Sequence, residues 1–389
     1  MKKAAIKPIS LVMALALALP LASCSSGSSS SSKNVIKIGL SAPMTGDISQ
    51  IGQSSKNAAD LAVAEVNDAG GLKLGDKTYT IELVVGDDEN KPESAANVFQ
   101  KLINQDNVIG IIGPPTSKCA NAGAPIAESA KTVMISSWAT NVNVTKDKSY
   151  VYRACFIDPF QGKVNATFAY DTLKAKTAAV LYDVASDYNK GLAEVFRDDF
   201  TALGGQIVAF ESYQTGDKDF KSQLTKIKAA SPEVLFLPNY YNEVALQLQQ
   251  AQQLGLSATF LGGDAWDSPD LFTLAGNTLL EGTYFSNHYA VDADVPELKA
   301  FLKAYNDKYK STPDATAALT YDAIKILIAG IQKAGSTDKT AIRDAVAATK
   351  DFSGVTGSIS YEGSGDPVKS AVMIKIVDGK YTYAATVKP

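Results

Sequence analysis

Histidine and cysteine are scarce in this sequence, which contains one histidine, His288, and three cysteines among 389 residues. Structural zinc sites are built from clusters of these two residue types, so we expect neither a metal nor another cofactor. The two later cysteines, Cys119 and Cys155, are either paired or free, because the sequence does not show whether they meet.

Sequence motifs for catalysis are also lacking. The chain has no Gly-x-Ser-x-Gly elbow, no Walker loop and no Gly-x-Gly-x-x-Gly after its first predicted strand. His288 has no matched serine or cysteine, and we interpret it as a residue of a strand. We therefore expect a protein that is not an enzyme.

Charge of one sign is present in only slight excess. The formal net charge is −4, and it becomes −7 without the first 23 residues, which carry three lysines and no acidic residue. A mildly acidic chain is a poor match for the phosphate backbone of DNA or RNA, so we expect no nucleic acid as a partner.

The N-terminus has the pattern of an export signal. Lys2–Lys7 is basic, and the apolar run Ile9–Leu19 that follows is too short and wrongly flanked for a membrane span. Leu21–Cys24, with small residues before a cysteine, resembles a bacterial lipobox, in which the cysteine is lipidated and becomes the mature N-terminus. Ser25–Ser32 has seven serines in eight residues and predicts a flexible tether. We expect an exported cell-membrane lipoprotein, on the extracellular face or in the periplasm, anchored by acyl chains on Cys24.

From Asn34 onward, apolar runs rich in β-branched residues alternate with helical segments, which is typical of parallel sheets. A second, similar series begins near Gln161, and the helices that follow it, such as Ala315–Ala334, most simply return to cover the first sheet. The fold class is therefore α/β, with two doubly wound parallel-sheet lobes joined by a three-strand hinge. The predicted segments are a lipoprotein signal peptide (1–23), a serine-rich tether (24–33), lobe 1 (34–156 plus 283–356) and lobe 2 (157–282 plus 357–389).

The stretch Val108–Thr140 is the candidate core of a binding site. It predicts a strand over Val108–Ile112, a helix that Thr116 or Ser117 caps, and a second strand that opens into hydroxyl-bearing residues. Ligands of open α/β sheets bind at the carboxyl ends of such strands, and a helix N-terminus favours a small anion such as a carboxylate. Alternatively, these hydroxyls serve only as helix caps.

Seven short motifs occur in order along the chain: IKIGLSAPMTG (36–46), AVAEVNDAGG (62–71), VVGDDENKP (84–92), VIGIIGPPTS (108–117), SDYNKGLAEVF (186–196), TGDKDFKSQL (215–224) and FLGGDAW (260–266). Together they resemble the type I periplasmic-binding-fold proteins of ABC importers, specifically the leucine/isoleucine/valine-binding branch. The resemblance extends over nearly the whole chain after the serine-rich segment. It implies a site for a free α-amino acid between two lobes that close by hinge motion.

In the first lobe, the resemblance implies three ligand contacts. Ser117 would hold the α-carboxylate with its hydroxyl and amide. Trp138 would offer a backbone carbonyl to the ammonium, and Thr140 would contribute its hydroxyl and amide to the zwitterion.

In the second lobe, the resemblance implies two aromatic contacts, Tyr188 and Tyr240, and an acidic partner for the ammonium, Asp264. Burying a zwitterion requires such partners, because unpaired buried charge is costly. The tyrosines alternatively serve in packing, and Gly-Gly-Asp is also a common turn. Tyr321 is a further candidate, which alternatively packs its own helix.

Two differences from the family leave the ligand's side chain open. An aromatic residue of the family corresponds to Ile51 here, and a small residue corresponds to Trp138, so the pocket gains one large group and loses another. The ligand is then a branched-chain, aromatic or small polar amino acid. The family's disulfide near residues 88–92 is missing, since no cysteine lies there.

The function we expect is capture of a free amino acid, branched-chain in the first instance, and its delivery to the permease subunits of an ABC importer by a monomeric, lipid-anchored protein. The alternative is a sensing protein that binds aromatic or other amino acids, amides or small carboxylates. Repressors share this fold, but an export signal and the lack of an N-terminal helix-turn-helix exclude them.

Overall fold

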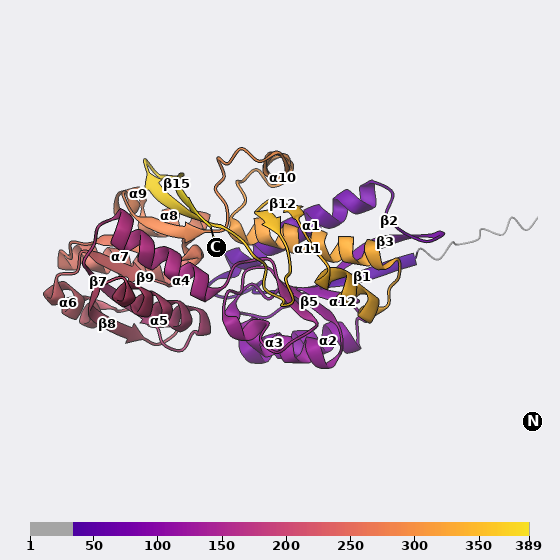
Figure 1. Cartoon of the computed structure of the whole chain (residues 1–389), viewed down its shortest axis with the longest axis horizontal. Coiled ribbons are helices and arrows are strands. Elements are labelled where there is room, and N and C mark those ends of the chain that lie inside the picture. Colours follow the sequence, from indigo (N-terminus) through magenta and orange to yellow (C-terminus); the bar gives the residue numbers. More distant parts are fainter. Residues whose placement is uncertain (1–33, 389) are drawn as a thin grey trace, which may run out of the picture. The chain divides into compact units, whose positions relative to one another are not determined.

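The computed structural model describes residues 34–388, so the predicted signal peptide, Cys24 and the serine-rich tether lie outside the described residues. Residues 34–388 form two large sheets, each covered by helices, and one two-stranded hairpin (Figure 1). We call the part built on the first sheet the first lobe and the part built on the second sheet the second lobe. Among the helices of residues 34–388, none has the length and apolar character needed to cross a membrane.

The first sheet has the strand order β2-β3-β1-β4-β5-β6. Neighbouring strands in this sheet run parallel, except β2 and β3, which are antiparallel. Its strands are β1 (Asn34–Ala42), β2 (Leu72–Leu74), β3 (Lys77–Asp87), β4 (Gly110–Ile112), β5 (Val133–Ser136) and β6 (Val151–Arg153). The helices between these strands are α1 (Ser49–Asp68), α2 (Pro92–Asn104) and α3 (Ser117–Ser129). The strand β2 was missed in the sequence, because three residues are too few to show a period of two.

The second sheet has the order β15-β14-β11-β10-β9-β7-β8, in which β7 to β11 are parallel and the last two strands antiparallel. Its strands are β7 (Thr177–Asp183), β8 (Gln206–Tyr213), β9 (Val234–Leu237), β10 (Thr259–Gly262), β11 (Tyr284–Asn287), β14 (Ala371–Val377) and β15 (Lys380–Val387). The accompanying helices are α4 (Asp158–Thr167), α5 (Asp187–Ala202), α6 (Lys221–Ala230), α7 (Tyr241–Leu254), α8 (Pro269–Ala275) and α9 (Asn277–Leu280).

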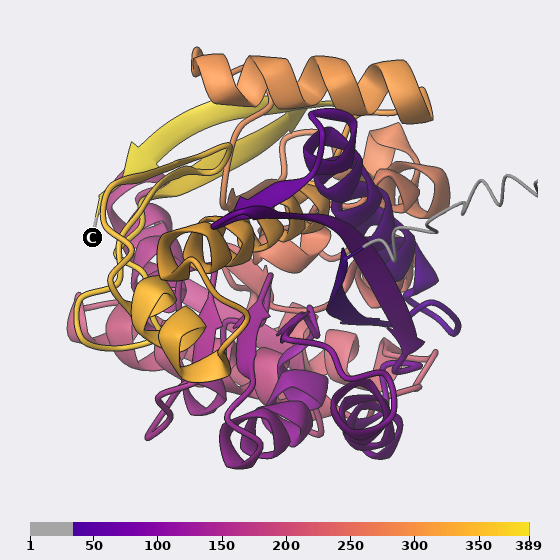
Figure 2. The same ribbon diagram turned by 90° about the vertical axis from the view of Figure 1, so that its right-hand side faces the viewer.

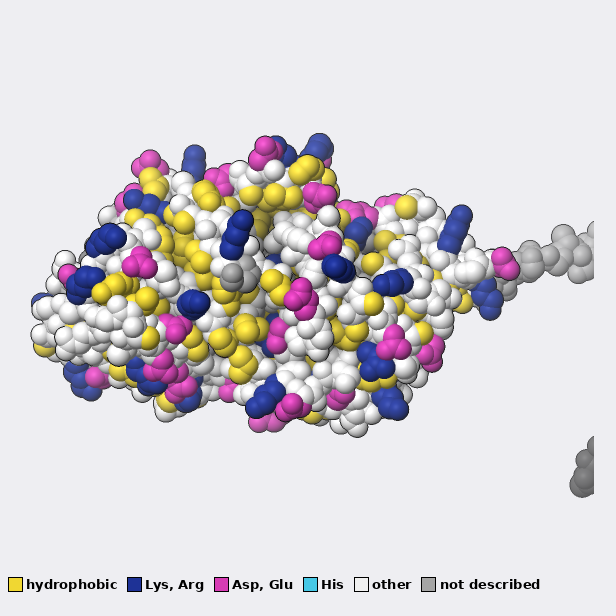
Figure 3. Space-filling model, in the orientation of Figure 1, with side chains coloured by type: hydrophobic (Ala, Val, Ile, Leu, Met, Phe, Trp, Pro, Cys, Tyr) yellow, Lys and Arg dark blue, Asp and Glu magenta, His cyan; other side chains and the backbone are white. Residues whose placement is uncertain are grey.

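Helices from the last third of the chain pack on the first lobe. They are α10 (Pro296–Tyr309), α11 (Ala315–Ala334) and α12 (Lys339–Ala347). The apolar helix α11 packs on α1, β4 and β5. In Figures 1 and 2, α10 lies outside both sheets, and α11 and α12 lie among the strands and helices of the first lobe. The charged side chains on the face seen in Figure 3 are of mixed sign, in keeping with the small net charge.

The segments that connect the lobes differ from the prediction in two ways. Residues 283–356 were assigned to the first lobe, but β11 pairs with β10 and β14 in the second sheet, so the chain crosses back after Asn287. The predicted three-strand hinge is also not made of regular strands. Within residues 34–388, the connecting segments 154–157, 288–295 and 360–370 contain no strand longer than the single bridge between Tyr361 and Pro367. The short strands β12 (Phe352–Gly354) and β13 (Gly357–Ile359) pair only with each other.

Candidate functional site

A small cavity lies between the two lobes. Its lining comes from the carboxyl ends of five parallel strands, β4 and β5 of the first sheet and β7, β9 and β10 of the second. The lining residues are Pro115, Ser117, Trp138, Tyr188, Tyr240, Asp264 and Ala265. Five of the residues named from the sequence are therefore brought together, at the edge of the sheets where ligands of this fold class bind.

The turn from β4 into α3 places Ser117 at the cavity. Gly113 has a φ of 84°, and a Cβ at this position would lie 2.2 Å from the Ser41 carbonyl oxygen, so this turn requires glycine. Thr116 is the N-cap residue of α3, but its side chain makes no capping hydrogen bond. The Ser117 hydroxyl instead accepts a 3.2 Å hydrogen bond from the Asn141 backbone N–H. The capping role expected for these hydroxyls is therefore absent.

Buried hydroxyls without hydrogen-bond partners gather at this edge of the first lobe. They belong to Thr116, Ser137 and Thr140, each at most 1% exposed. None of these three residues is among those that line the cavity. The first N–H groups of α3, which lack intrahelical acceptors, suit a carboxylate beside Ser117.

Arg153 holds the backbone around Thr140. Its buried guanidinium donates to the carbonyl oxygens of Ala139, at 2.7 Å, and Asn141, at 3.0 Å, and it pairs with Asp366. The residues on both sides of Thr140 are thus fixed by one side chain, which sequence reasoning did not identify.

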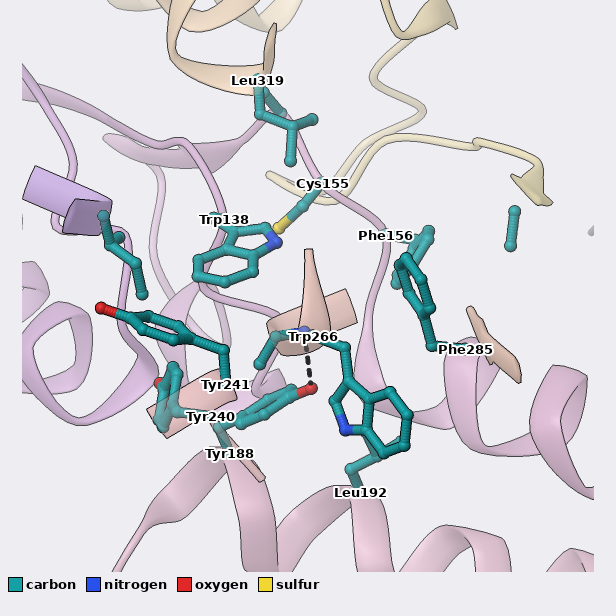
Figure 4. Close-up of a cluster of buried hydrophobic side chains, with 14 of the residues drawn as sticks. Trp138, Cys155, Phe156, Tyr188, Leu192, Tyr240, Tyr241, Trp266, Phe285 and Leu319 are labelled. Carbon is teal, nitrogen blue, oxygen red and sulfur yellow. Dashed lines mark hydrogen bonds between the residues drawn. The ribbon is translucent and has the colours of Figure 1, made fainter. Parts of the chain in front are cut away.

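Three aromatic rings form the apolar part of the cavity. Tyr240 lies 5.5 Å from Tyr188 and 6.4 Å from Trp138, measured between ring centroids, and the second pair meets edge to face. Figure 4 shows these rings, from both lobes, gathered around a common space. Aromatic faces beside the polar groups of Ser117 and Asp264 suit a ligand that has both an apolar and a charged part.

Asp264 is the buried anion of the site, with 1% of its surface exposed. Its Oδ1 accepts hydrogen bonds from the Tyr188 hydroxyl at 2.7 Å and from Gln161 Nε2 at 2.8 Å, and its Oδ2 lies 2.8 Å from His288 Nε2. Burial raises the pKa of Tyr188 well above its usual value and lowers the pKa of His288, so both side chains are neutral donors at pH 7.

His288 and Gln161 are site residues that sequence reasoning missed. His288 was interpreted as a strand residue, but it directly follows β11 and contacts Asp264. Gln161 lies on α4 and was seen only as a helix start. Neither belongs to a motif that marks a partner for Asp264, so only the folded structure reveals them.

Three of the candidates, Thr140, Ile51 and Tyr321, are not among the residues that line the cavity. Ile51, on α1, is 2% exposed and packs in the hydrophobic core. Tyr321, on α11, lines a separate groove, where its hydroxyl donates to Glu65 at 2.6 Å beside Lys325. The packing alternative for Tyr321 therefore describes its surroundings better than the binding one.

Both cysteines of the described region are free and buried, and burial raises the pKa of each thiol, Cys119 and Cys155, to about 12. Between residues 34 and 388, no group of three or more His, Cys, Asp or Glu side chains is placed to hold a metal ion.

Two helix-covered lobes with a small polar and aromatic cavity between them define a solute-binding protein of the type I periplasmic-binding fold. Residues 35–380 match the periplasmic binding protein family, and the chain belongs to this family. Its proteins bind substrates for ABC transporters outside the cytoplasm and are not enzymes, in agreement with the sequence prediction.

Relatives in several bacteria cover most of the chain. The leucine-, isoleucine-, valine-, threonine-, and alanine-binding protein of Pseudomonas aeruginosa is 30% identical over 334 residues, which is 86% of this chain and 87% of the relative. The Leu/Ile/Val-binding protein BraC3 of Rhizobium johnstonii is 32% identical, over 85% and 88% of the two chains.

Solved structures are similar over nearly their whole length. The leucine-binding protein LivK of Thermotoga maritima has a TM-score of 0.86 and 37% identity, covering 91% of this chain and 99% of its own. The branched-chain amino acid transporter substrate-binding protein LivJ of Streptococcus pneumoniae, solved with isoleucine, has a TM-score of 0.86 and 35% identity, covering 92% and 100%. A Rhodopseudomonas palustris protein with benzoate is 23% identical and shares the fold.

Proposed function

We propose that this protein captures a free amino acid with a small aliphatic side chain in the cavity between its lobes. The observation that carries the proposal is that one cavity has hydrogen-bond donors for a carboxylate on one lobe and an anion for an ammonium on the other. Ser117 and the start of α3 supply donors on the first lobe, and Asp264 supplies an anion on the second. An α-amino acid has a carboxylate and an ammonium on the same carbon, so both lobes must contact it at once.

The residue roles follow from this arrangement. Ser117 and Thr140 hold the carboxylate, the Trp138 carbonyl and Asp264 hold the ammonium, and Tyr188 completes the second-lobe side. Ligand binding then favours the closed arrangement, because only that arrangement supplies partners for both charges.

The relatives support a branched-chain or smaller side chain. Relatives of 30–37% identity carry names that include leucine, isoleucine, valine, threonine and alanine.

The N-terminal pattern supports a location at the membrane. We propose that Cys24 carries the lipid anchor and that the closed form delivers its ligand, as a monomer, to the permease of an ABC importer. Growth of cells with a Cys24→Ser variant in radiolabelled lipid tests the anchor. The label should be lost from the variant and kept by the wild-type protein.

A thermal-shift screen of the chain from Asn34 onward tests the ligand, since residues 34–389 form a compact unit with their own core. The twenty amino acids, several amides and small carboxylates are added after the protein has been unfolded and dialysed. Leucine, isoleucine or valine should raise the melting temperature, because binding to the folded state stabilises it. A rise with phenylalanine or tyrosine alone would contradict the small aliphatic side chain, and no rise with any amino acid would contradict the site.

A further inference from the structure

Asp264 has one hydrogen-bonding position left, and it lies on the oxygen that His288 contacts. Tyr188 and Gln161 both donate to Oδ1, whereas His288 Nε2 alone is 2.8 Å from Oδ2. A carboxylate has about four lone-pair positions. A ligand ammonium that binds Asp264 would therefore share Oδ2 with the imidazole.

The imidazole of His288 is held so that it cannot turn away from this position. Its ring stacks on Phe156, with 3.7 Å between ring centroids, and Phe156 lies on the first connecting segment. His288 itself begins the second connecting segment, directly after β11. Both side chains are 2% exposed, so a charge on the ring would be poorly solvated.

The charges around His288 come from several elements. Asp264, after β10, favours the imidazolium, whereas burial and Lys369, before β14, disfavour it and lower the pKa of His288 below its ordinary value of 6.5. Burial lowers the pKa of Lys369 to about 8, so this lysine keeps its positive charge in acid. On the first connecting segment, burial keeps the Cys155 thiol neutral. Asp158, at the start of α4, interacts electrostatically with Asp264, and the two like charges repel each other.

We propose that His288 is a positioning residue: its neutral imidazole orients the Asp264 carboxylate for the ligand ammonium, and its protonation weakens ligand binding. This inference rests on the proposed function. A protonated His288 would neutralise Asp264 and place a second positive charge beside the ammonium. By linkage, ligand binding then lowers the pKa of His288 and releases a proton in the acid range.

The sign of the pH dependence follows. The ligand is a zwitterion throughout pH 5–7, because its own groups titrate outside this range. Affinity should be highest where His288 is neutral and should fall as the pH drops through the pKa of His288 in the free protein. If the pKa of His288 is about half a unit to one unit lower in the ligand-bound protein than in the free protein, the affinity falls by about three- to tenfold in acid.

Titration calorimetry with leucine between pH 7.5 and pH 5 tests the proposal, using the chain from Asn34 onward. His288→Gln keeps an N–H donor near the position of Nε2 but cannot titrate, so it should bind leucine at pH 7.5 and show a smaller loss of affinity in acid than the wild type, with only the contribution of groups such as Asp158 remaining. Asp88→Asn is the matched control. It removes a buried carboxylate whose pKa burial raises to about 6, in contact with Ser41 and not with Asp264, and it should keep the wild-type slope.

The imidazole resonances provide a second measurement, since the chain has a single histidine. A proton NMR titration of the wild-type protein should show a lower pKa of His288 with saturating leucine than without it. An unchanged pKa, or an equal slope in His288→Gln and wild type, would overturn the inference even if the variant folds poorly. Absence of binding by any amino acid at pH 7.5 would instead reject the proposed function itself.

Discussion

Asn121 of the first lobe donates a 2.7 Å hydrogen bond from Nδ2 to the carboxylate of Asp187 in the second lobe. A neighbouring bond, 3.0 Å long, runs from Asn141 Nδ2 to the backbone carbonyl of Asp187. Asp187 begins α5, the same helix that carries Tyr188 into the cavity. The contact between the lobes and the contact with the ligand are therefore made by adjacent residues.

This relationship predicts that Asn121→Ala weakens ligand binding without lowering stability. Alanine is a good helix former within α3, but the variant lacks the bond that favours the closed arrangement. An exposed charge-assisted bond supports a loss of affinity of about two- to fivefold, measured by calorimetry. The control is Asn104→Ala, at the end of α2. Asn104 hydrogen-bonds to Gln100 of its own helix and not to the second lobe, so this variant should bind like the wild type. Equal affinities for the two variants would show that the Asn121–Asp187 bond has no part in closure.

Replacement of Asp264 by asparagine should have a much larger effect on binding. The ligand ammonium would lose its anion while remaining buried, which costs about 2–5 kcal/mol. Asp292→Asn removes the same charge from an exposed loop and should leave the affinity unchanged. Calorimetry distinguishes these outcomes, and wild-type affinity in Asp264→Asn would remove Asp264 from the site.

Much of the fold follows from local signals in the sequence. The bounds of α11 were predicted as observed, because the Asp314 side chain caps this helix and Gly335 ends it in a left-handed conformation. Ser117 and Asp264 line one cavity, because each follows the carboxyl end of a parallel strand and these ends of the two sheets face each other there.

The features that sequence reasoning missed depend on contacts between distant segments. His288 meets Asp264 only because β11 adds to the second sheet beside β10, and that pairing has no local signal. Gln161 reaches Asp264 across 103 positions. Tyr321 was a plausible site residue by resemblance, but the orientation of α11 turns it toward Glu65.

Arg153 should be important for stability as well as for the shape of the site. It is fully buried, and its loss would leave the carbonyl oxygens of Ala139 and Asn141 without their donor, which costs about 2–6 kcal/mol in total at about 1–3 kcal/mol each. We expect Arg153→Met to lower the free energy of unfolding in urea by this amount. Arg343→Met is the control, since Arg343 pairs with its exposed neighbour Asp344, and it should change the stability little. A stable Arg153→Met variant would contradict the role assigned to the guanidinium.

The two thiols of the folded region should be unreactive in the native protein. Burial raises the pKa of Cys119 and Cys155 to about 12, so the thiolate that reacts with disulfide reagents is nearly absent at pH 8. A colorimetric thiol assay on the chain from Asn34 onward should detect no rapid labelling in buffer and two thiols in denaturant. Detection of none in denaturant would indicate a disulfide and contradict the structure.

Buried carboxylates should make the protein more stable in mild acid than at pH 8. Burial raises the pKa of Asp158, Asp267 and Glu243 to about 7 and that of Asp314 to about 6. The folded state then binds protons more tightly than the unfolded state, so the free energy of unfolding falls as the pH rises from about 4 to about 7. The lowered pKa of His288 has the opposite effect on the free energy of unfolding below pH 6.5, but this is a single group, whereas four carboxyl groups favour the folded state in acid.

Asp267→Asn tests this pH dependence at a single position. The Asp267 carboxylate accepts hydrogen bonds from Asn287 at 2.9 Å and from the backbone N–H of Ala315, at the start of α11, at 2.8 Å. An amide oxygen can accept in the same way without a buried charge, so the variant should gain about 1–3 kcal/mol at pH 8 and little at pH 5. Urea unfolding at both pH values, with Asp292→Asn as the exposed control, measures the difference. An equal change at pH 5 and pH 8 would mean that Asp267 does not titrate in this range and that its role is to hold α11 against the second lobe.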